Sequence, residues 1–145
     1  HYLRGDFENA AIAYTQCMSV SNNDDLMCAT VDWLYMTYRK MNRKQEAQAL
    51  LGLIRENMNI VENDSYYKRL KMYQGKLQPD SLLSFDTADE NYDLNLATQG
   101  YGVGNWYLYN GDTVTASRIF KQVVSGKSQS AFGFIAAETD LGRIQ

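Results

Sequence analysis

Few side chains in this sequence could take part in catalysis. The only histidine is His1, at a chain terminus, where side chains are seldom held in one position. Acid–base and nucleophilic catalysis usually depend on a positioned histidine. Adjacent carboxylates occur at Asp24-Asp25 and Asp89-Glu90, but both pairs fall in predicted loops, where solvated surface charge explains them best. We therefore assign no catalytic residue and predict that the chain is not an enzyme.

Two glycine-containing segments match phosphate-binding motifs only in part. Segment 126–128 (Gly-Lys-Ser) has the end of a P-loop, but Lys121 stands where the first glycine belongs. Segment 100–104 (Gly-Tyr-Gly-Val-Gly) has glycines two residues apart, but Asn105 replaces the last glycine of the dinucleotide fingerprint. No strand is predicted before either segment. We expect segment 126–128 to form a turn. In segment 100–104, we expect the glycines to let a neighbouring helix or a ligand backbone come close.

The two cysteines, Cys17 and Cys28, have a spacing that fits no CxxC metal or redox motif. The favoured interpretation is that both are small buried apolar residues at helix contacts. The alternative is a disulfide across the intervening loop, which requires an oxidising compartment. We predict neither a metal ion nor a cofactor.

Composition favours an all-α protein and argues against nucleic acid and membrane. A single proline in 145 residues suits continuous helices with short connections. The net charge of -3 does not suit binding to phosphate backbones. The densest basic cluster, Lys68, Arg69 and Lys71, is predicted to be the solvated face of a helix. No apolar run approaches the roughly 20 residues that cross a bilayer.

One spacing recurs three times along the chain and indicates how it folds. A glycine or asparagine is followed after five residues by alanine, after four more by a large residue, and after three more by another apolar one. The copies are Gly5-Ala10-Tyr14-Cys17, Asn42-Ala47-Leu51-Ile54 and Gly111-Ala116-Phe120-Val123. Glycine and asparagine tolerate the left-handed conformation that ends a helix, and a small residue lets two helices approach closely. The repeated unit is therefore predicted to be a helical hairpin.

The hydrophobic pattern predicts where these helices lie. We expect helices over Phe7–Met18, Leu26–Met41, Lys44–Met58, Ile60–Tyr73, Asp93–Asn110, Thr113–Ser125 and Ala131–Arg143, with a short helix around Ser81–Leu83 and a loop over Ser84–Asn91. The copy that begins at Gly75 is incomplete, because Asp80 stands where alanine is expected. Any function that distinguishes this chain from a generic repeat is expected near Gly75 and Asp80.

The chain resembles the tetratricopeptide repeat family. Gly104, Tyr107, Gly111, Ala116 and Phe120 match its Gly-x-x-Tyr…Ala-x-x-x-Phe pattern. The resemblance implies an all-α, right-handed superhelical array of antiparallel helix hairpins, with about three and a half repeats. It implies one repeat domain over residues 1–145. We expect this domain to be part of a longer protein, since both ends read as half-hairpins.

The order of a complete hairpin, a short one and a second complete one is similar to the C-terminal half of bacterial outer-membrane lipoproteins. Those proteins act as adaptors for envelope proteases and peptidoglycan hydrolases. This likeness favours an exported, periplasmic location in a bacterium, and a cytoplasmic location is the alternative.

In tetratricopeptide repeats, the first helix of each hairpin lines a concave groove that binds peptides. Nine positions here correspond to that surface: Trp33, Met36, Arg39, Tyr66, Arg69, Tyr73, Tyr101, Asn105 and Tyr109. Aromatic rings bury a large area on binding, and arginine can clamp carboxylates. The resemblance therefore implies a peptide or helix of a client protein as the partner. The alternative function is a structural spacer or homodimerisation unit, and several of the rings could instead fill the core between hairpins.

Overall fold

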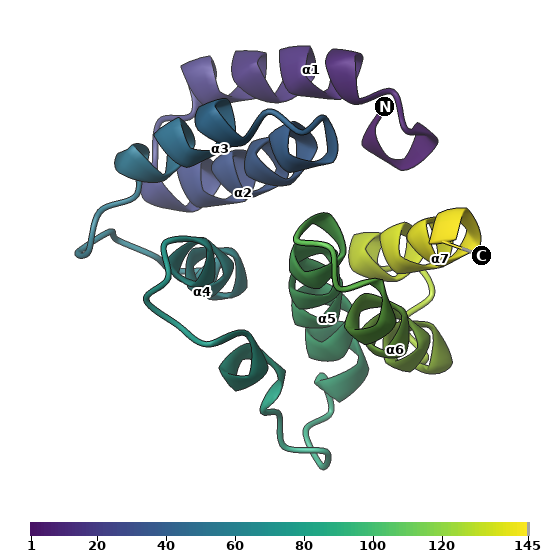
Figure 1. Cartoon of the computed structure of the whole chain (residues 1–145). Coiled ribbons are helices and arrows are strands. Elements are labelled where there is room, and N and C mark those ends of the chain that lie inside the picture. Colours follow the sequence, from purple (N-terminus) through teal and green to yellow (C-terminus); the bar gives the residue numbers. More distant parts are fainter. Residues whose placement is uncertain (145) are drawn as a thin grey trace. The chain divides into compact units, whose positions relative to one another are not determined.

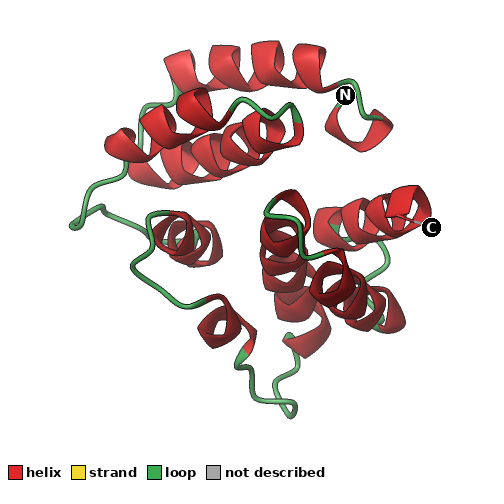
Figure 2. Cartoon of the chain, viewed as in Figure 1, coloured by secondary structure: helices red, strands yellow, loops and turns green. Residues whose placement is uncertain are grey.

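The computed structural model describes residues 1–144, and the regular elements among them are all helical (Figures 1 and 2), which confirms the all-α prediction. The α-helices are α1 (Phe7–Val20), α2 (Asp24–Lys40), α3 (Lys44–Leu50), α4 (Asp64–Tyr73), α5 (Tyr92–Tyr109), α6 (Thr113–Ser125) and α7 (Phe132–Ile144). The 3-10 helices are η1 (Tyr2–Arg4), η2 (Leu51–Leu53) and η3 (Pro79–Leu83). Contacts divide the chain into two compact units, His1–Lys76 and Leu77–Gln145, hereafter unit 1 and unit 2. A single repeat domain over the whole chain stays a prediction.

The turns between helices follow the repeated spacing. Gly5, Asn42, Gly75 and Gly111 adopt the left-handed conformation, with φ of 76°, 58°, 77° and 95°. Asn42 is the only residue other than glycine with positive φ in the described part of the chain. Asparagine tolerates this conformation better than most residues with a side chain. The prediction that glycine and asparagine end helices at these positions is confirmed.

In unit 1, helix α2 is the central element, and α1, α3 and α4 each contact it (Figure 1). The alanines of the repeated spacing lie at close helix contacts, since Ala10 and Ala47 are buried. Cys28 is buried as expected, whereas Cys17 is exposed on α1, and both thiols are free. The prediction that both cysteines are buried is therefore wrong for Cys17, and the disulfide does not form in this structure.

The second helix of the middle hairpin is shorter than predicted. The sequence pattern extends it to Met58, but α3 ends at Leu50, η2 ends at Leu53, and α4 begins only at Asp64.

The intervening loop is held by two carboxylates in the first turn of α2. Asp25 accepts bonds from the backbone N–H groups of Val61, Glu62 and Asn63 at 2.7–3.0 Å. Asp24 accepts from the Asn59 N–H at 2.7 Å and from the Arg55 guanidinium at 3.0 Å. The interpretation of Asp24-Asp25 as solvated loop charge is therefore wrong.

Neutralising Asp25 is expected to loosen this loop. Hydrogen bonds from the Asn63, Val61 and Glu62 amides lower the pKa of the Asp25 carboxyl below its usual value. Its stabilising contribution is therefore present above the ordinary aspartate pKa and is lost as the pH falls through the lowered value. For Asp25→Asn we expect faster hydrogen exchange at the amides of residues 61–63 and a weaker loss of stability on acidification. Glu62→Gln, which alters an exposed carboxyl group in the same loop, is the control; equal effects of the two substitutions would contradict this role.

In unit 2, helix α5 packs against α6, α7 and η3. Three glycines allow the close approach. A Cβ atom on Gly100 would lie 2.5 Å from Val123 Cγ2, and one on Gly104 would lie 2.5 Å from the Phe120 ring. A Cβ atom on Gly133 of α7 would lie 2.2 Å from the carbonyl oxygen of Ala97. Of the two roles predicted for the glycines of α5, the structure shows contact with a neighbouring helix.

Candidate functional site

The structure buries most of the residues that the repeat resemblance places in a binding groove. Six of the nine are buried: Trp33, Met36, Arg69, Tyr73, Tyr101 and Asn105. The other three, Arg39, Tyr66 and Tyr109, are half-buried. Most of these side chains are therefore enclosed in this structure, and their assignment to a binding groove stays a prediction. Whether any of them contacts a partner stays a prediction.

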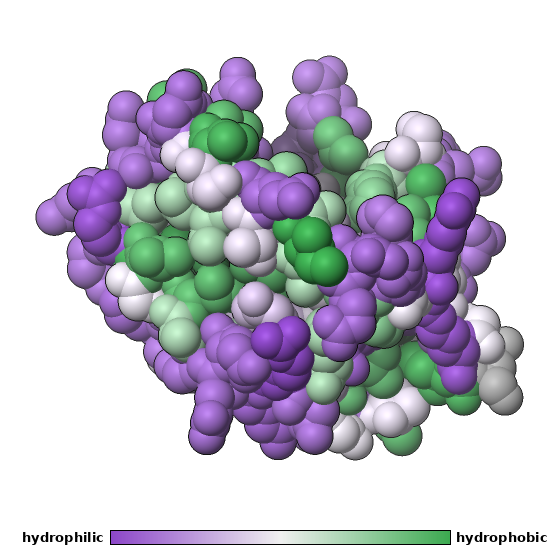
Figure 3. All heavy atoms as spheres, turned by 90° about the horizontal axis from the view of Figure 1, so that it is seen from above, coloured by the Kyte–Doolittle hydropathy of each residue, from purple (hydrophilic) through white to green (hydrophobic). Residues whose placement is uncertain are grey.

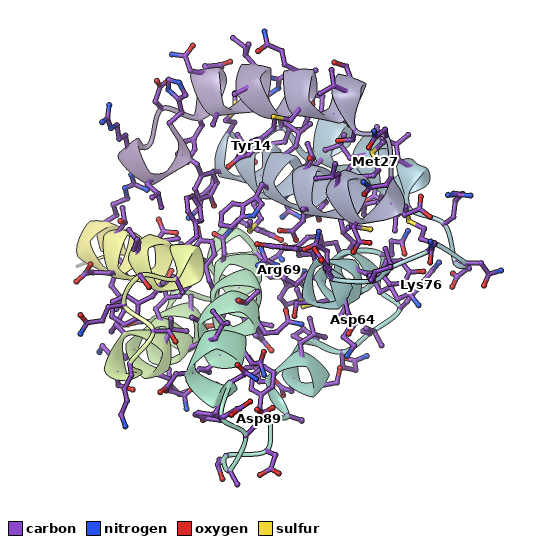
Figure 4. The ribbon with its side chains drawn as sticks, turned by 180° about the vertical axis from the view of Figure 1, so that it is seen from behind. Tyr14, Met27, Asp64, Arg69, Lys76 and Asp89 are labelled. Atoms are coloured by element: carbon purple, nitrogen blue, oxygen red, sulfur yellow. The ribbon has the colours of Figure 1, made fainter. Side chains whose placement is uncertain are left out.

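In unit 1, Arg69 brings other predicted positions together around an ion pair with Asp32. The Arg69 guanidinium donates to Asp32 Oδ1 at 3.0 Å and lies 2.7 Å from Oδ2, and both side chains are at most 1% exposed. The Tyr73 hydroxyl donates to the same Oδ1 at 2.9 Å. Arg69 lies between α2 and α4 (Figure 4), so this ion pair connects the two helices.

Sulfur and aromatic groups surround the ion pair. Arg69 Nη2 lies 3.0 Å from the Met36 sulfur, and the guanidinium lies 5.6 Å from the Trp33 ring and 5.2 Å from the Tyr66 ring. Such distances give cation–π attraction. Trp33, Met36, Tyr66 and Tyr73 therefore surround Arg69 within unit 1.

In this cluster, burial disfavours the charged forms of Asp32 and Arg69, whereas their ion pair favours those forms. Burial raises the pKa of Asp32 to about 6, while the Arg69 guanidinium and the Tyr73 hydroxyl oppose that shift. Burial alone would lower the pKa of Arg69, but the Asp32 carboxylate outweighs it and raises that pKa. The pair is therefore ionised at neutral pH. Arg69 is compensated inside the protein, so the prediction that it lies on a solvated helix face is wrong.

The predicted positions in unit 2 lie on α5. The Tyr101 hydroxyl donates to Asp140 Oδ2 at 2.9 Å, and its ring stacks on Phe120 with 5.7 Å between centroids. These contacts join α5 to α7 and α6. Asn105 is buried on the same helix, and Tyr109 is half-buried in its last turn.

A cavity lies at the incomplete third copy of the repeat. It has a volume of about 530 Å³ and is bounded by η3, α5 and the C-terminal half of α6. We refer to it as the η3 cleft. Its walls are formed by Asp80, Leu83, Tyr92, Asp93, Leu96, Arg118, Gln122, Ser125 and Gly126.

The cleft exists because the sequence of the third copy breaks the repeat. Five residues after Gly111, Ala116 is buried where α6 packs on α5. Five residues after Gly75 stands Asp80, whose charge resists burial without a partner. Accordingly Asp80 is exposed, and η3 spans Pro79–Leu83 where the last hairpin has the longer helix α6. A short helix covers less of α5, which leaves the cleft open.

Carboxylates outnumber cations around the η3 cleft. Asp80 and Asp93 lie in its wall beside one cation, Arg118. The loop from Ser84 to Asn91 adds Asp86, Asp89 and Glu90 and no lysine or arginine; Asp89 is labelled in Figure 4. Burial raises the pKa of Tyr107, and the carboxylates of Asp80 and Asp112 raise it further. Negative formal charge therefore predominates in the wall and in the adjoining loop.

Residue types alone identify only part of this cleft. The sequence does indicate this region of the chain, because Asp80 stands where the repeated spacing has alanine. Asp93, Arg118 and Gln122 carry no signal of their own, because charged residues on predicted helices are usually solvated. They are brought together only when α5 and α6 pack against each other.

Among residues 1–144, no group of three or more histidine, cysteine, aspartate or glutamate side chains could hold a metal ion. In the same part of the chain, none of the helices combines the length and the apolar character that crossing a bilayer requires. Figure 3, which views the molecule from the side of α1, shows apolar surface as separate patches among hydrophilic side chains.

Comparison of the chain with protein families, curated proteins and solved structures found no match.

Proposed function

We propose that this chain is a tetratricopeptide-like helical-repeat module that binds a segment of another protein. One observation carries the proposal. At Gly5, Asn42 and Gly111 a left-handed residue ends one helix, and five residues later a buried alanine lies in the next helix. The same local geometry thus recurs three times along the chain.

Recurring hairpins of this kind support a binding role because each hairpin packs against its neighbours and leaves long faces of the array uncovered. Stacked repeats provide extended surfaces that suit segments of partner proteins. In this proposal the hairpins form a right-handed superhelical array. The six buried positions Trp33, Met36, Arg69, Tyr73, Tyr101 and Asn105 shape the array, and contact with the partner falls to exposed and half-buried side chains.

Peptide display tests the proposed function and does not require the identity of the partner. The folded chain is immobilised and used to select from a random peptide library, and the urea-unfolded chain serves as the control. We expect a related set of sequences to be enriched on the folded chain only, with micromolar affinity for the synthesised peptides. Failure to enrich any set above the unfolded control would contradict the proposal.

Self-association is the outcome that would favour a spacer or dimerisation role instead. Light scattering over a range of protein concentrations measures it directly. We expect the molar mass to stay that of one chain and the selected peptides to bind without changing it. A stable dimer that does not bind peptides would contradict the proposed function.

A further inference from the structure

The η3 cleft has the size of a site for one or two side chains. Its volume is about 530 Å³, within the usual range of ligand pockets. An entire helix could not enter such a space, whereas one long side chain and its flanking backbone could. All nine residues of its wall belong to unit 2.

The apolar part of the wall suits the carbon chain of a long side chain. Leu83 and Leu96 provide aliphatic surface, and Tyr92 provides an aromatic ring. The Phe85 ring packs on Tyr92 edge to face, with 6.3 Å between centroids, and this contact restricts the orientation of the tyrosine. Lysine and arginine bury their methylene groups on surfaces of this kind while their charges stay near polar groups.

The charged part of the wall selects the sign of the guest. Asp80 projects from η3 and Asp93 from the first turn of α5, so two carboxylates border the cleft from two elements. Asp93 Oδ1 would lie 3.0 Å from a Cβ atom on Gly126, which places this carboxylate against the end of α6. Arg118 is the only cation of the wall, where two carboxylates face it. A tyrosine ring and two carboxylates together attract a guanidinium or ammonium group.

We propose that the η3 cleft binds an arginine or lysine side chain presented by a segment of the partner protein. The inference rests on the proposed function, because it assigns the site and the chemistry of the partner within the same binding role. The broken third copy is then the element that gives this chain its specificity.

Binding of a defined cationic peptide tests the inference. The probe is a fluorescein-labelled peptide of alternating glycine and arginine, and its affinity is measured by fluorescence anisotropy at constant salt. We expect Asp80→Asn/Asp93→Asn to weaken binding by about tenfold or more, the loss expected for one charge-assisted contact. The control, Glu8→Gln/Asp64→Asn, changes net charge equally at exposed carboxylates of unit 1 and is expected to change the affinity less than about twofold. Equal losses in the two double variants would show unspecific attraction and overturn the inference.

A second variant covers the case in which the loss of Asp80 disturbs η3. Ser125 is exposed in the wall of the cleft, and Ser125→Arg places a tethered cation there while both carboxylates stay. We expect this variant to compete with the probe and to weaken its binding about tenfold or more. Unchanged affinity in Ser125→Arg would overturn the inference.

Three further outcomes distinguish a failure of this inference from a failure of the proposed function. If display yields binding peptides but the glycine-arginine probe does not bind, the cleft assignment fails and the proposed function stands. If a glycine-glutamate peptide binds more tightly than the arginine probe, the sign of the guest is wrong and the inference is overturned. If neither probe nor any displayed peptide binds, the proposed function itself fails.

Discussion

Replacing Asp32 by asparagine is expected to lower the free energy of unfolding of unit 1 by about 3–5 kcal/mol. The substitution preserves the shape of the side chain but leaves the Arg69 guanidinium, which is 1% exposed, without its counter-charge. Arginine does not give up its proton in proteins, so the uncompensated charge stays. Urea unfolding followed by the fluorescence of Trp33 in a Trp106→Phe background measures this loss, since these are the only two tryptophans.

A double-mutant cycle separates the ion pair from general damage to the core. Arg69→Met alone is expected to be destabilising, and Asp32→Asn/Arg69→Met is expected to cost less than the sum of the two single changes. Lys68 on the same helix forms an exposed ion pair with Asp64 at 2.8 Å, and Lys68→Met is the control. It is expected to cost no more than about 0.5 kcal/mol. Additive effects of the Asp32 and Arg69 changes would contradict the account of the cluster.

Replacing Gly133 by alanine is expected to destabilise unit 2 by about 1–3 kcal/mol or more. The new Cβ atom would lie 2.2 Å from the Ala97 carbonyl oxygen and 2.8 Å from its carbon. Backbone atoms within α5 cannot rotate away as a side chain can, so the two helices must separate. Urea unfolding followed by Trp106 fluorescence in a Trp33→Phe background measures the effect on unit 2.

Gly142 on the same helix is the matched control. A Cβ atom there would meet nothing within 4 Å. Because alanine favours helix more than glycine, Gly142→Ala is expected to be neutral or to stabilise by up to about 1 kcal/mol. Gly104→Ala is expected to fall between the two, since the atoms it meets belong to the Phe120 ring. Similar stabilities for Gly133→Ala and Gly142→Ala would contradict the close approach of α5 and α7.

Local features of the fold can be predicted from the sequence because they depend on neighbouring residues. Helix α6 spans Thr113–Ser125 as predicted, since Asp112 caps its start and a serine-glycine turn follows it. Asn42 takes the place of glycine in a left-handed turn for the same local reason. The ordered loop between η2 and α4 has no such local signal, because it is held by the carboxylates of Asp24 and Asp25, more than thirty residues from the amides that they bind.

The surroundings of Arg69 and the residues of the η3 cleft are harder to predict than the helices. A basic run around Arg69 favours a solvated side chain, yet its partner Asp32 lies 37 positions away in the sequence. Periodicity shows which residues share a helix face, but it does not distinguish a face that meets another helix from one that meets a ligand. The incomplete repeat at Asp80 is the more informative signal, because a missing packing residue predicts space between elements.

An amide NMR titration tests most directly the central claim that this repeat chain binds a partner segment at the η3 cleft. A display-selected peptide is added to the ¹⁵N-labelled chain, and chemical-shift changes are mapped on the sequence. We predict that the largest changes fall in Pro79–Leu83, the first turn of α5 and the last turns of α6, and that Asp80→Asn/Asp93→Asn reduces them. Changes confined to other elements, with the cleft amides unmoved at saturation, would contradict the account.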